Sequence, residues 1–141
     1  MTEVVLSALV VVHNEEAQLA DCLELLNFAD ELVVVLDKCT DGSKVIAEEF
    51  NARLVEGAWE IEGHRRNAGL ESCRGAWILE VDADERASPD LGREICSAIK
   101  GLNDGYFLLP FDNYIGNRLV QYGWGGSWGV SAAPRLSAKS V

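Results

Sequence analysis

The sequence predicts an α/β fold with a mainly parallel central sheet covered by helices. Two observations carry this prediction. Apolar, β-branched runs alternate with helix-like segments over about the first hundred residues, and three of these runs end in polar clusters. Strands that alternate with helices pair in parallel through right-handed crossovers. The chain of 141 residues, with 48% hydrophobic side chains, has the size and composition of one globular domain.

The first half of the chain is expected to supply three strands and two helices. Its first apolar run has hydrophobic residues on both faces, as a central buried strand does. In the segment that follows, apolar residues recur along one helical stripe. The expected elements are a strand over Val4–Val12, a helix over Glu16–Leu26, a strand over Glu31–Asp37, a helix over Lys44–Phe50 and a short strand over Arg53–Val55.

The second half is expected to repeat this alternation and then to change in character. Ser88 and Pro89 have the order of an N-cap followed by the first helical residue. After Gly101 the chain becomes rich in glycine and tryptophan. The expected elements are a helix over Glu62–Cys73 with Gly75 near its C-terminal cap, a strand over Ala76–Val81, a helix over Asp90–Lys100 and a strand over Tyr106–Phe111.

The charge of the chain limits its partners. The formal net charge is −11. Nucleic-acid sites need a basic stripe, so we expect no nucleic-acid partner. A small anionic ligand is still compatible with this charge, because a bound divalent cation can supply the positive charge that the protein lacks.

The cysteines and the apolar runs indicate a cytoplasmic protein. The four cysteines form no CxxC pair, which argues against a zinc site. No signal peptide is evident, so free thiols in a reducing cytoplasm are expected. The longest apolar run is too short to span a bilayer, which needs about 20 residues. Peripheral attachment to a membrane, at the inner face of the cell membrane, is left open.

A dense acidic patch follows the apolar strand that ends at Val81. On an extended strand Asp82 and Asp84 would point the same way, with Ala83 opposite. Two like charges on one face repel unless water or a cation lies between them. Mg²⁺ or Mn²⁺ suits this arrangement, because such ions take carboxylate oxygens and complete their shell with water and phosphates. The alternative is a patch of solvated acids ahead of the helix that begins after Ser88.

Two further polar clusters and a pair of arginines belong to the same argument. The clusters His13–Glu16 and Asp37–Gly42 follow two other strands, and the carboxyl ends of parallel strands meet at one edge, where open α/β sheets bind ligands. Arg65 and Arg66 precede the acidic strand, and the planar fork of arginine suits a diphosphate. The alternative for both arginines is a surface pair with Glu62 or Glu71 at helical spacing.

In their order, these motifs resemble family 2 glycosyltransferases of the GT-A fold, and in particular the lipopolysaccharide-core type similar to β-1,4-glucosyltransferases. The likeness runs without interruption over about residues 3–90 and continues through 114–118, 123–124 and 134–136. The segments that carry it are Val10–Glu16, Phe28–Glu31, Asp37–Gly42, Arg66–Gly69, Gly75 and Asp82–Glu85.

The resemblance implies a GT-A-type, Rossmann-like αβα sandwich and assigns roles to single residues. Asp37 would hold the base, which is implied to be uracil, and Arg66 would lie near the diphosphate. Asp82 and Asp84 would form the DxD motif, with Asp84 as the more direct ligand of Mg²⁺ or Mn²⁺. The metal would stabilise the leaving nucleoside diphosphate. The implied nucleotide-binding residues are Val12, His13, Asn14, Glu15, Asp37, Arg66 and Asp82.

The sequence departs from this family in two places. Lys38, Cys39 and Thr40 stand where a small hydroxyl pattern is usual. No recognisable motif surrounds the carboxylates that could serve as the catalytic base of an inverting enzyme, so the base is unassigned and Asp112 is its weak candidate. We therefore expect a single domain over 1–141, in which 1–100 binds the nucleotide and 101–141 begins an incomplete acceptor-side region.

The expected function is the inverting, metal-dependent transfer of a sugar from a nucleotide-diphosphate donor, UDP-linked, to a glycan or glycolipid. The acceptor would belong to the cell envelope or the lipopolysaccharide core. One alternative is a nucleotide-sugar-binding module without base or acceptor site. Another is a nucleotidyltransferase, which needs a glycine- and lysine-rich first loop that this chain lacks. The late aromatics could stack on sugars, but packing is the favoured role for Tyr114, Tyr122, Trp124 and Trp128.

Overall fold

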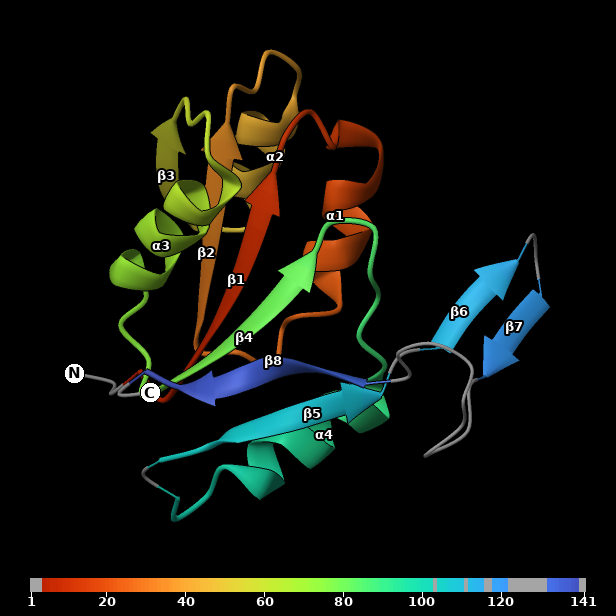
Figure 1. The fold of residues 1–141 in the computed structure, drawn as a ribbon. Coiled ribbons are helices and arrows are strands. Elements are labelled where there is room, and N and C mark those ends of the chain that lie inside the picture. The colour runs from red at the N-terminus through yellow and green to blue at the C-terminus, as the bar shows by residue number, and fades with distance from the viewer. Residues whose placement is uncertain (1–3, 103, 111, 116–117, 122–131, 140–141) are drawn as a thin grey trace.

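The computed structural model describes residues 4–102, 104–110, 112–115, 118–121 and 132–139 (Figure 1). Strands and helices alternate through four strands and four helices, and the described chain after the fourth helix adds strands alone. The elements are β1 (Leu6–Val12), α1 (Glu16–Glu24), β2 (Glu31–Asp37), α2 (Ser43–Glu49), β3 (Arg53–Gly57), α3 (Glu62–Ser72), β4 (Trp77–Asp82), α4 (Pro89–Ala98), β5 (Tyr106–Pro110), β6 (Asp112–Ile115), β7 (Arg118–Gln121) and β8 (Ala132–Ala138).

The main sheet has the strand order β3-β2-β1-β4-β8-β5, and its first four strands are parallel. Val12 lies beside Leu36, and Val11 lies beside Asp82. The carboxyl ends of β1, β2 and β4 therefore lie along one edge of the sheet, and their arrowheads point toward the top of Figure 1. This register brings the loops that follow the three strands together, as the sequence predicted.

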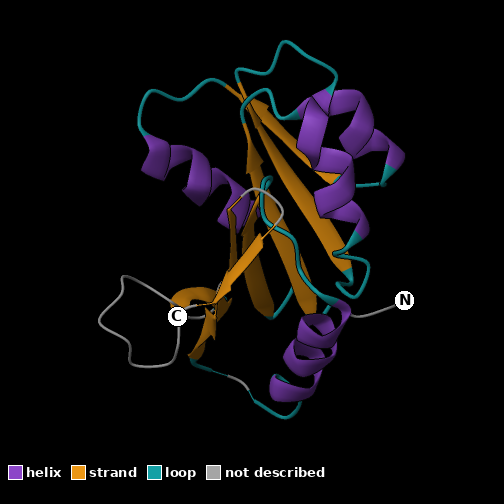
Figure 2. Ribbon diagram, turned by 90° about the vertical axis from the view of Figure 1, so that its right-hand side faces the viewer, coloured by secondary structure: helices purple, strands orange, loops and turns teal. Residues whose placement is uncertain are grey.

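Helices cover both faces of the sheet, which confirms the expected αβα sandwich. In Figure 2, α3 lies alone on one side, and α1, α2 and α4 lie on the other. The side chains of β1 alternate between two cores. Ala8, Val10 and Val12 join the larger core beneath the three helices, whereas Leu9 joins the smaller core beneath α3.

Helix α3 packs very closely on the sheet because it carries a glycine where it crosses the strands. A Cβ atom added to Gly69 would come within 2.6 Å of a Leu9 methyl carbon and 2.7 Å of a Val35 methyl carbon. The close approach fixes the position of the preceding turn of the helix, which carries Arg65 and Arg66.

Gly75 does not cap α3, contrary to the prediction. The helix ends at Ser72, and the next residue, Cys73, has an extended backbone. Gly75 lies instead against the start of β1, where its N–H donates to Ser7 Oγ at 2.8 Å. A Cβ atom here would lie 2.7 Å from the Ser7 backbone nitrogen. Close packing rather than helix termination therefore requires the glycine.

The start of α4 follows the predicted capping pattern. Pro89 begins the helix, and Ser88 Oγ accepts a hydrogen bond from Leu91 N at 3.1 Å. No helix in the described part of the chain is long and apolar enough to cross a membrane.

The later strands go beyond the sequence prediction. Strand β5 was expected, but the β6–β7 hairpin and β8 were not. Strand β8 enters the main sheet between β4 and β5 and runs antiparallel to both. It contains Pro134, which usually argues against an inner strand. The sheet tolerates this proline because β4 pairs only with Leu136–Ala138, beyond the proline.

Candidate functional site

The loop after β1 is tied to the loop after β2. Asn14 has a φ of 51°, and its side chain contacts the loop after β2. Asn14 Oδ1 accepts hydrogen bonds from Thr40 N at 2.8 Å and Asp41 N at 3.3 Å. His13 Nδ1 lies 2.8 Å from Asp37 O. Two of the predicted nucleotide-binding residues thus shape the loop that carries a third.

The same loops are joined a second time where α1 and α2 begin. Glu15 N donates to Ser43 Oγ at 3.1 Å, and Glu16 N donates to Asp41 Oδ2 at 3.1 Å. Glu16 Oε2 accepts in return from Gly42 N at 2.8 Å. These bonds hold the two helix starts at the carboxyl edge of the sheet.

Lys38 and Cys39, which depart from the family pattern, do not separate the loop after β2 from its neighbours. Lys38 has a φ of 53° and donates its N–H to Gly57 O at 2.9 Å. Cys39 turns inward, and its thiol donates to Val12 O at 3.4 Å. Burial raises the pKa of the Cys39 thiol, so this cysteine stays protonated and packs against the end of β1.

Asp37 is the buried carboxylate of the site, with 4% of its surface exposed. Its Oδ1 accepts from Trp59 N at 3.0 Å, and its Oδ2 accepts from Arg65 Nη1 at 2.9 Å. Burial alone would raise the pKa of Asp37, but the hydrogen bonds from Arg65 and Trp59 N outweigh it and lower the pKa. Arg65 also pairs with Glu62 at 3.3 Å, so the surface-pair alternative describes part of its contacts.

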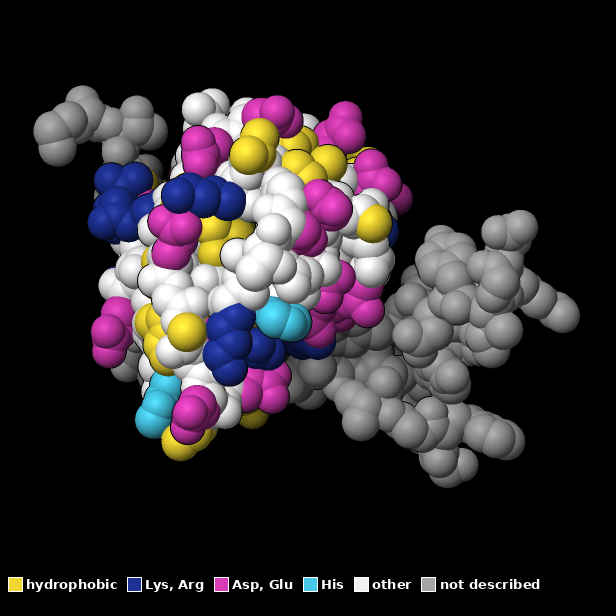
Figure 3. Space-filling view, turned by 90° about the horizontal axis from the view of Figure 1, so that it is seen from above, with side chains coloured by type: hydrophobic (Ala, Val, Ile, Leu, Met, Phe, Trp, Pro, Cys, Tyr) yellow, Lys and Arg dark blue, Asp and Glu magenta, His cyan; other side chains and the backbone are white. Residues whose placement is uncertain are grey.

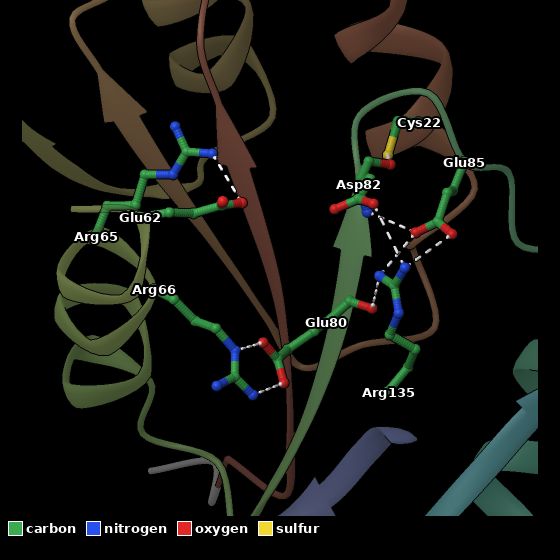
Figure 4. Close-up of polar contacts among 8 residues, drawn as sticks. All are labelled: Cys22, Glu62, Arg65, Arg66, Glu80, Asp82, Glu85 and Arg135. Atoms are coloured by element: carbon green, nitrogen blue, oxygen red, sulfur yellow. Dashed lines mark hydrogen bonds and ion pairs between the residues drawn. The ribbon is translucent and has the colours of Figure 1, made fainter. Parts of the chain in front are cut away.

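Arg66 crosses from α3 to β4 rather than pairing along its own helix. Its Nε and Nη2 donate to the two carboxylate oxygens of Glu80, at 2.5 Å and 2.8 Å (Figure 4). The pair lies in a pocket of about 320 Å³ between α3 and the strands. The lining residues are Leu9, Val11, Glu62, Arg65, Arg66, Glu80, Val81, Asp82 and Arg135.

The acidic motif forms a turn, so the interpretation that Asp82 and Asp84 share one face of a strand is wrong. Strand β4 ends at Asp82, and Glu85 N donates to Asp82 O at 2.9 Å. Glu85 Oε1 accepts in return from Asp82 N at 2.7 Å. Both aspartates are nevertheless exposed, and Ala83 between them is buried, as the sequence indicated.

Arg135 of β8 is a residue of this site for which the sequence suggested no role. Its guanidinium donates to Glu85 Oε1 at 3.0 Å, to Glu85 Oε2 at 3.3 Å and to Asp82 Oδ2 at 3.4 Å (Figure 4). It also donates to the backbone oxygen of Glu80 at 3.4 Å. The sequence signal was the Pro134–Leu136 segment of the family likeness, but nothing local indicated that this segment reaches β4.

The carboxylates of the motif fit a metal that is shared with a ligand. Within the described ranges, no group of three or more His, Cys, Asp or Glu side chains could hold a metal ion by itself. Mg²⁺ and Mn²⁺ commonly bind through one or two carboxylates plus substrate phosphates, and the exposed Asp82 and Asp84 offer that donor set. Burial raises the pKa of Glu85, although the hydrogen bond from Asp82 N and the charge of Arg135 oppose this rise.

Basic and acidic side chains lie among one another on the face above the strand ends (Figure 3). The side chains of five other residues named in the sequence analysis lie outside the described part of the chain. Asp112 begins β6 opposite Gln121, and its side chain lies outside the described part of the chain, as does that of Tyr114. The aromatic residues Tyr122, Trp124 and Trp128 lie outside the described residues altogether.

The αβα sandwich with a mainly parallel sheet defines an α/β domain of the Rossmann-like class, in which ligands bind outside the carboxyl ends of the strands. The family model of glycosyl transferase family 2 matches residues 7–124, and the chain belongs to this family. The family resemblance noted in the sequence is thereby confirmed.

Several curated relatives of this chain carry glycosyltransferase names. An uncharacterized glycosyltransferase of Rickettsia bellii is 34% identical over 91 residues, which are 64% of this chain and 31% of the relative. The lipopolysaccharide core biosynthesis glycosyltransferase LpsC of Rhizobium meliloti is 31% identical over 104 residues, which are 70% of this chain and 38% of LpsC. The chain thus spans about a third of the length of these relatives.

Solved structures confirm the GT-A fold. S. aureus TarS 1–349 matches 96% of this chain and 47% of its own, with a TM-score of 0.72 and 20% identity. Its complex with UDP-GlcNAc matches 67% of this chain and 31% of its own, with a TM-score of 0.57 and 26% identity. Glucosyl-3-phosphoglycerate synthase from Mycobacterium tuberculosis, in complex with Mn²⁺ and UDP, matches 59% of this chain and 36% of its own, with a TM-score of 0.52 and 19% identity.

Proposed function

We propose that this chain is the donor-binding part of an inverting, metal-dependent glycosyltransferase that uses a UDP-linked sugar. The observation that carries the proposal is the pocket between α3 and strands β1 and β4, which is lined by three arginines, Arg65, Arg66 and Arg135, and by the exposed Asp82. Arginines suit a diphosphate, and the carboxylates suit the metal that accompanies it.

The nucleoside would lie against the loop Val12–Glu15 and Asp37. Both oxygens of Asp37 already accept one hydrogen bond, from Trp59 N and from Arg65. Each carboxylate oxygen can accept a second, so Asp37 retains the capacity to receive the N–H of a uracil ring. The TarS complex with UDP-GlcNAc supports a UDP-linked donor, because TarS shares the family fold and 26% of the aligned residues.

The diphosphate would lie between α3 and the acidic turn. Arg66 and Asp82 border this position, and Asp84, with Asp82, would hold Mg²⁺ or Mn²⁺. The metal, when bound, would stabilise the charge that develops on the leaving UDP. Inversion then requires a carboxylate that takes the proton from the acceptor hydroxyl. Asp112 stays the weak candidate for that base.

The proposed acceptor is a glycan or glycolipid of the cell envelope, of the lipopolysaccharide-core type. The similarity to LpsC supports this class of acceptor. A glycolipid acceptor would place the protein in the cytoplasm at the inner face of the membrane, where peripheral contact suffices.

A transfer assay tests this function. The protein is incubated with Mn²⁺, with UDP-glucose or UDP-GlcNAc, and with truncated lipopolysaccharide core as acceptor. We expect release of UDP that requires both the metal and the acceptor, and an inverted anomeric centre in the product by NMR. Tight UDP binding without sugar transfer would favour the alternative, a nucleotide-sugar-binding module without base or acceptor site. An axial product from an α-linked donor would contradict inversion.

A further inference from the structure

Arg135 occupies an unusual place in the candidate site. It comes from β8, the antiparallel strand that joins the sheet beside β4. Its guanidinium lies against both oxygens of Glu85 and one oxygen of Asp82, so it contacts the first aspartate of the DxD motif directly (Figure 4). Its side chain is 26% exposed and lines the same pocket as Arg66.

The charges explain what this arginine does in the free protein. Asp82, Asp84 and Glu85 place three carboxyl groups within one turn, and like charges at such spacing repel. A guanidinium that donates to two of them offsets the repulsion and fixes their direction. A divalent cation at the same carboxylates would offset the same repulsion. The two cations therefore compete for Asp82.

The ligand changes this competition. Asp82 and Asp84 would hold the metal, so the guanidinium would lose its contact with Asp82, and a diphosphate bound beside the metal would offer it new oxygen partners. Arginine has five N–H donors in a planar fork that matches phosphate oxygens. Arg135 and Arg66 line the same pocket, so a diphosphate bound there would lie near both side chains.

We infer that Arg135 is a positioning residue that holds Asp82 and Glu85 in the free protein and turns to the donor's diphosphate when the metal binds. This inference rests on the proposed function and adds to it a residue that couples metal binding to donor binding. The exchange makes binding of the metal and the donor cooperative. The metal takes Asp82 from Arg135, and the diphosphate gives Arg135 a new partner, so each ligand makes binding of the other more favourable.

The test is a pair of titrations on the variant Arg135→Gln. With Mn²⁺ alone, we expect the affinity to rise by about threefold or more, because a competing cation is gone. With UDP at saturating Mn²⁺, we expect the affinity to fall by about tenfold, because a phosphate partner is gone. A purely structural arginine would not shift the two affinities in opposite directions.

Two further variants separate charge from geometry. Arg135→Lys retains the charge but lacks the fork, so it should keep the parent affinity for Mn²⁺ and lose part of the affinity for UDP. Arg93→Gln, on the exposed surface of α4, removes the same charge away from the pocket and should change neither affinity by more than about twofold. Thermal melting of each variant establishes that it is folded.

The outcomes distinguish this inference from the proposed function. If the parent protein shows no Mn²⁺-dependent UDP binding, the proposed function fails and the role of Arg135 fails with it. If the parent binds, but both affinities of Arg135→Gln fall together or stay unchanged, the inference about Arg135 is overturned and the donor site stands. If the glutamine variant does not fold, Arg135→Lys takes its place, and an unchanged UDP affinity in that variant overturns the inference about Arg135.

Discussion

Asp84 and Asp82 have different surroundings although they belong to one short motif. Asp82 ends β4 and contacts Arg135, whereas Asp84 is exposed in the turn that follows. Both side chains are exposed, but Asp82 Oδ2 already lies 3.4 Å from the guanidinium of Arg135, a cation that a metal would have to displace. This difference supports Asp84 as the more direct ligand in the proposed site.

Replacing Asp84 tests that assignment. We expect Asp84→Ala to lose most of the Mn²⁺-dependent affinity for UDP, by about tenfold or more, while the circular dichroism spectrum and the melting temperature change little. The control is Asp90→Ala, which removes an exposed acid from the first turn of α4. Equal UDP affinity of Asp84→Ala and the parent would mean that the acids are only a solvated turn.

In the proposed site, Asp37 binds the nucleoside and does not hold the metal. We expect Asp37→Asn to weaken UDP binding without metal, because the amide keeps only one acceptor oxygen, for which Trp59 N and Arg65 already compete with the base N–H. Binding of pyrophosphate, which has no base, should change little in the same variant. Competition titrations with UDP and pyrophosphate measure both effects. A parent protein that binds the two ligands equally would contradict the role of Asp37.

Helix α3 carries Arg65 and Arg66, and Gly69 sets its distance from the sheet. We expect Gly69→Ala to destabilise the fold by about 1–3 kcal/mol, because its Cβ would overlap the buried side chains of Leu9 and Val35. Gly63 on the same helix faces open space, so Gly63→Ala should be neutral or stabilising by up to about 1 kcal/mol. Urea unfolding of both variants gives the comparison, and equal stability of the two would refute the close packing.

The amino ends of three strands are held together by Glu31. Its Oε2 accepts from Ser7 Oγ at 2.6 Å and from Arg74 N at 2.9 Å, and its Oε1 accepts from Arg74 Nε at 2.7 Å. Burial alone would raise the pKa of Glu31, but these hydrogen bonds outweigh it and lower the pKa below the ordinary value of 4.5. The ionised form therefore stabilises the folded state.

This shift predicts how stability depends on pH. Because the folded pKa is lowered, the contribution of Glu31 is fully present above about pH 4.5 and is lost as the pH falls through the folded pKa. We expect Glu31→Gln to be less stable at neutral pH by about 1–3 kcal/mol and to lose less stability on acidification. Urea unfolding from pH 7 to pH 3 measures this, with the exposed Glu60→Gln as control. Parallel pH profiles for the parent and Glu31→Gln would contradict it.

For the molecule as a whole, the sequence predicts the first four strands well because each has a strong local signal. Apolar runs alternate with helical stripes there, and the parallel order follows from the crossovers. Strand β8 has no such signal: Ala132–Ala138 does not alternate and contains Pro134. Its place is set by pairing with β4 and β5, which are distant in sequence.

The candidate site, too, could be predicted from the sequence only in part. The sequence placed three polar loops at one edge of the sheet, because strand ends in a parallel sheet must meet there. It did not predict which charges pair across elements. Arg66 pairs with Glu80 on β4 rather than with a helical neighbour, and Arg135 reaches the acidic turn from β8. Such pairs depend on tertiary distances, which local spacing does not contain.

The central claim is that the edge of the sheet binds a nucleoside diphosphate together with a metal. The most direct test is a calorimetric titration of the protein with UDP, with and without Mn²⁺. The account predicts binding that is strong with Mn²⁺ and at least about tenfold weaker without it, because the acidic site needs the cation to accept a diphosphate. Absence of binding under both conditions, or equal binding under both, would contradict the account.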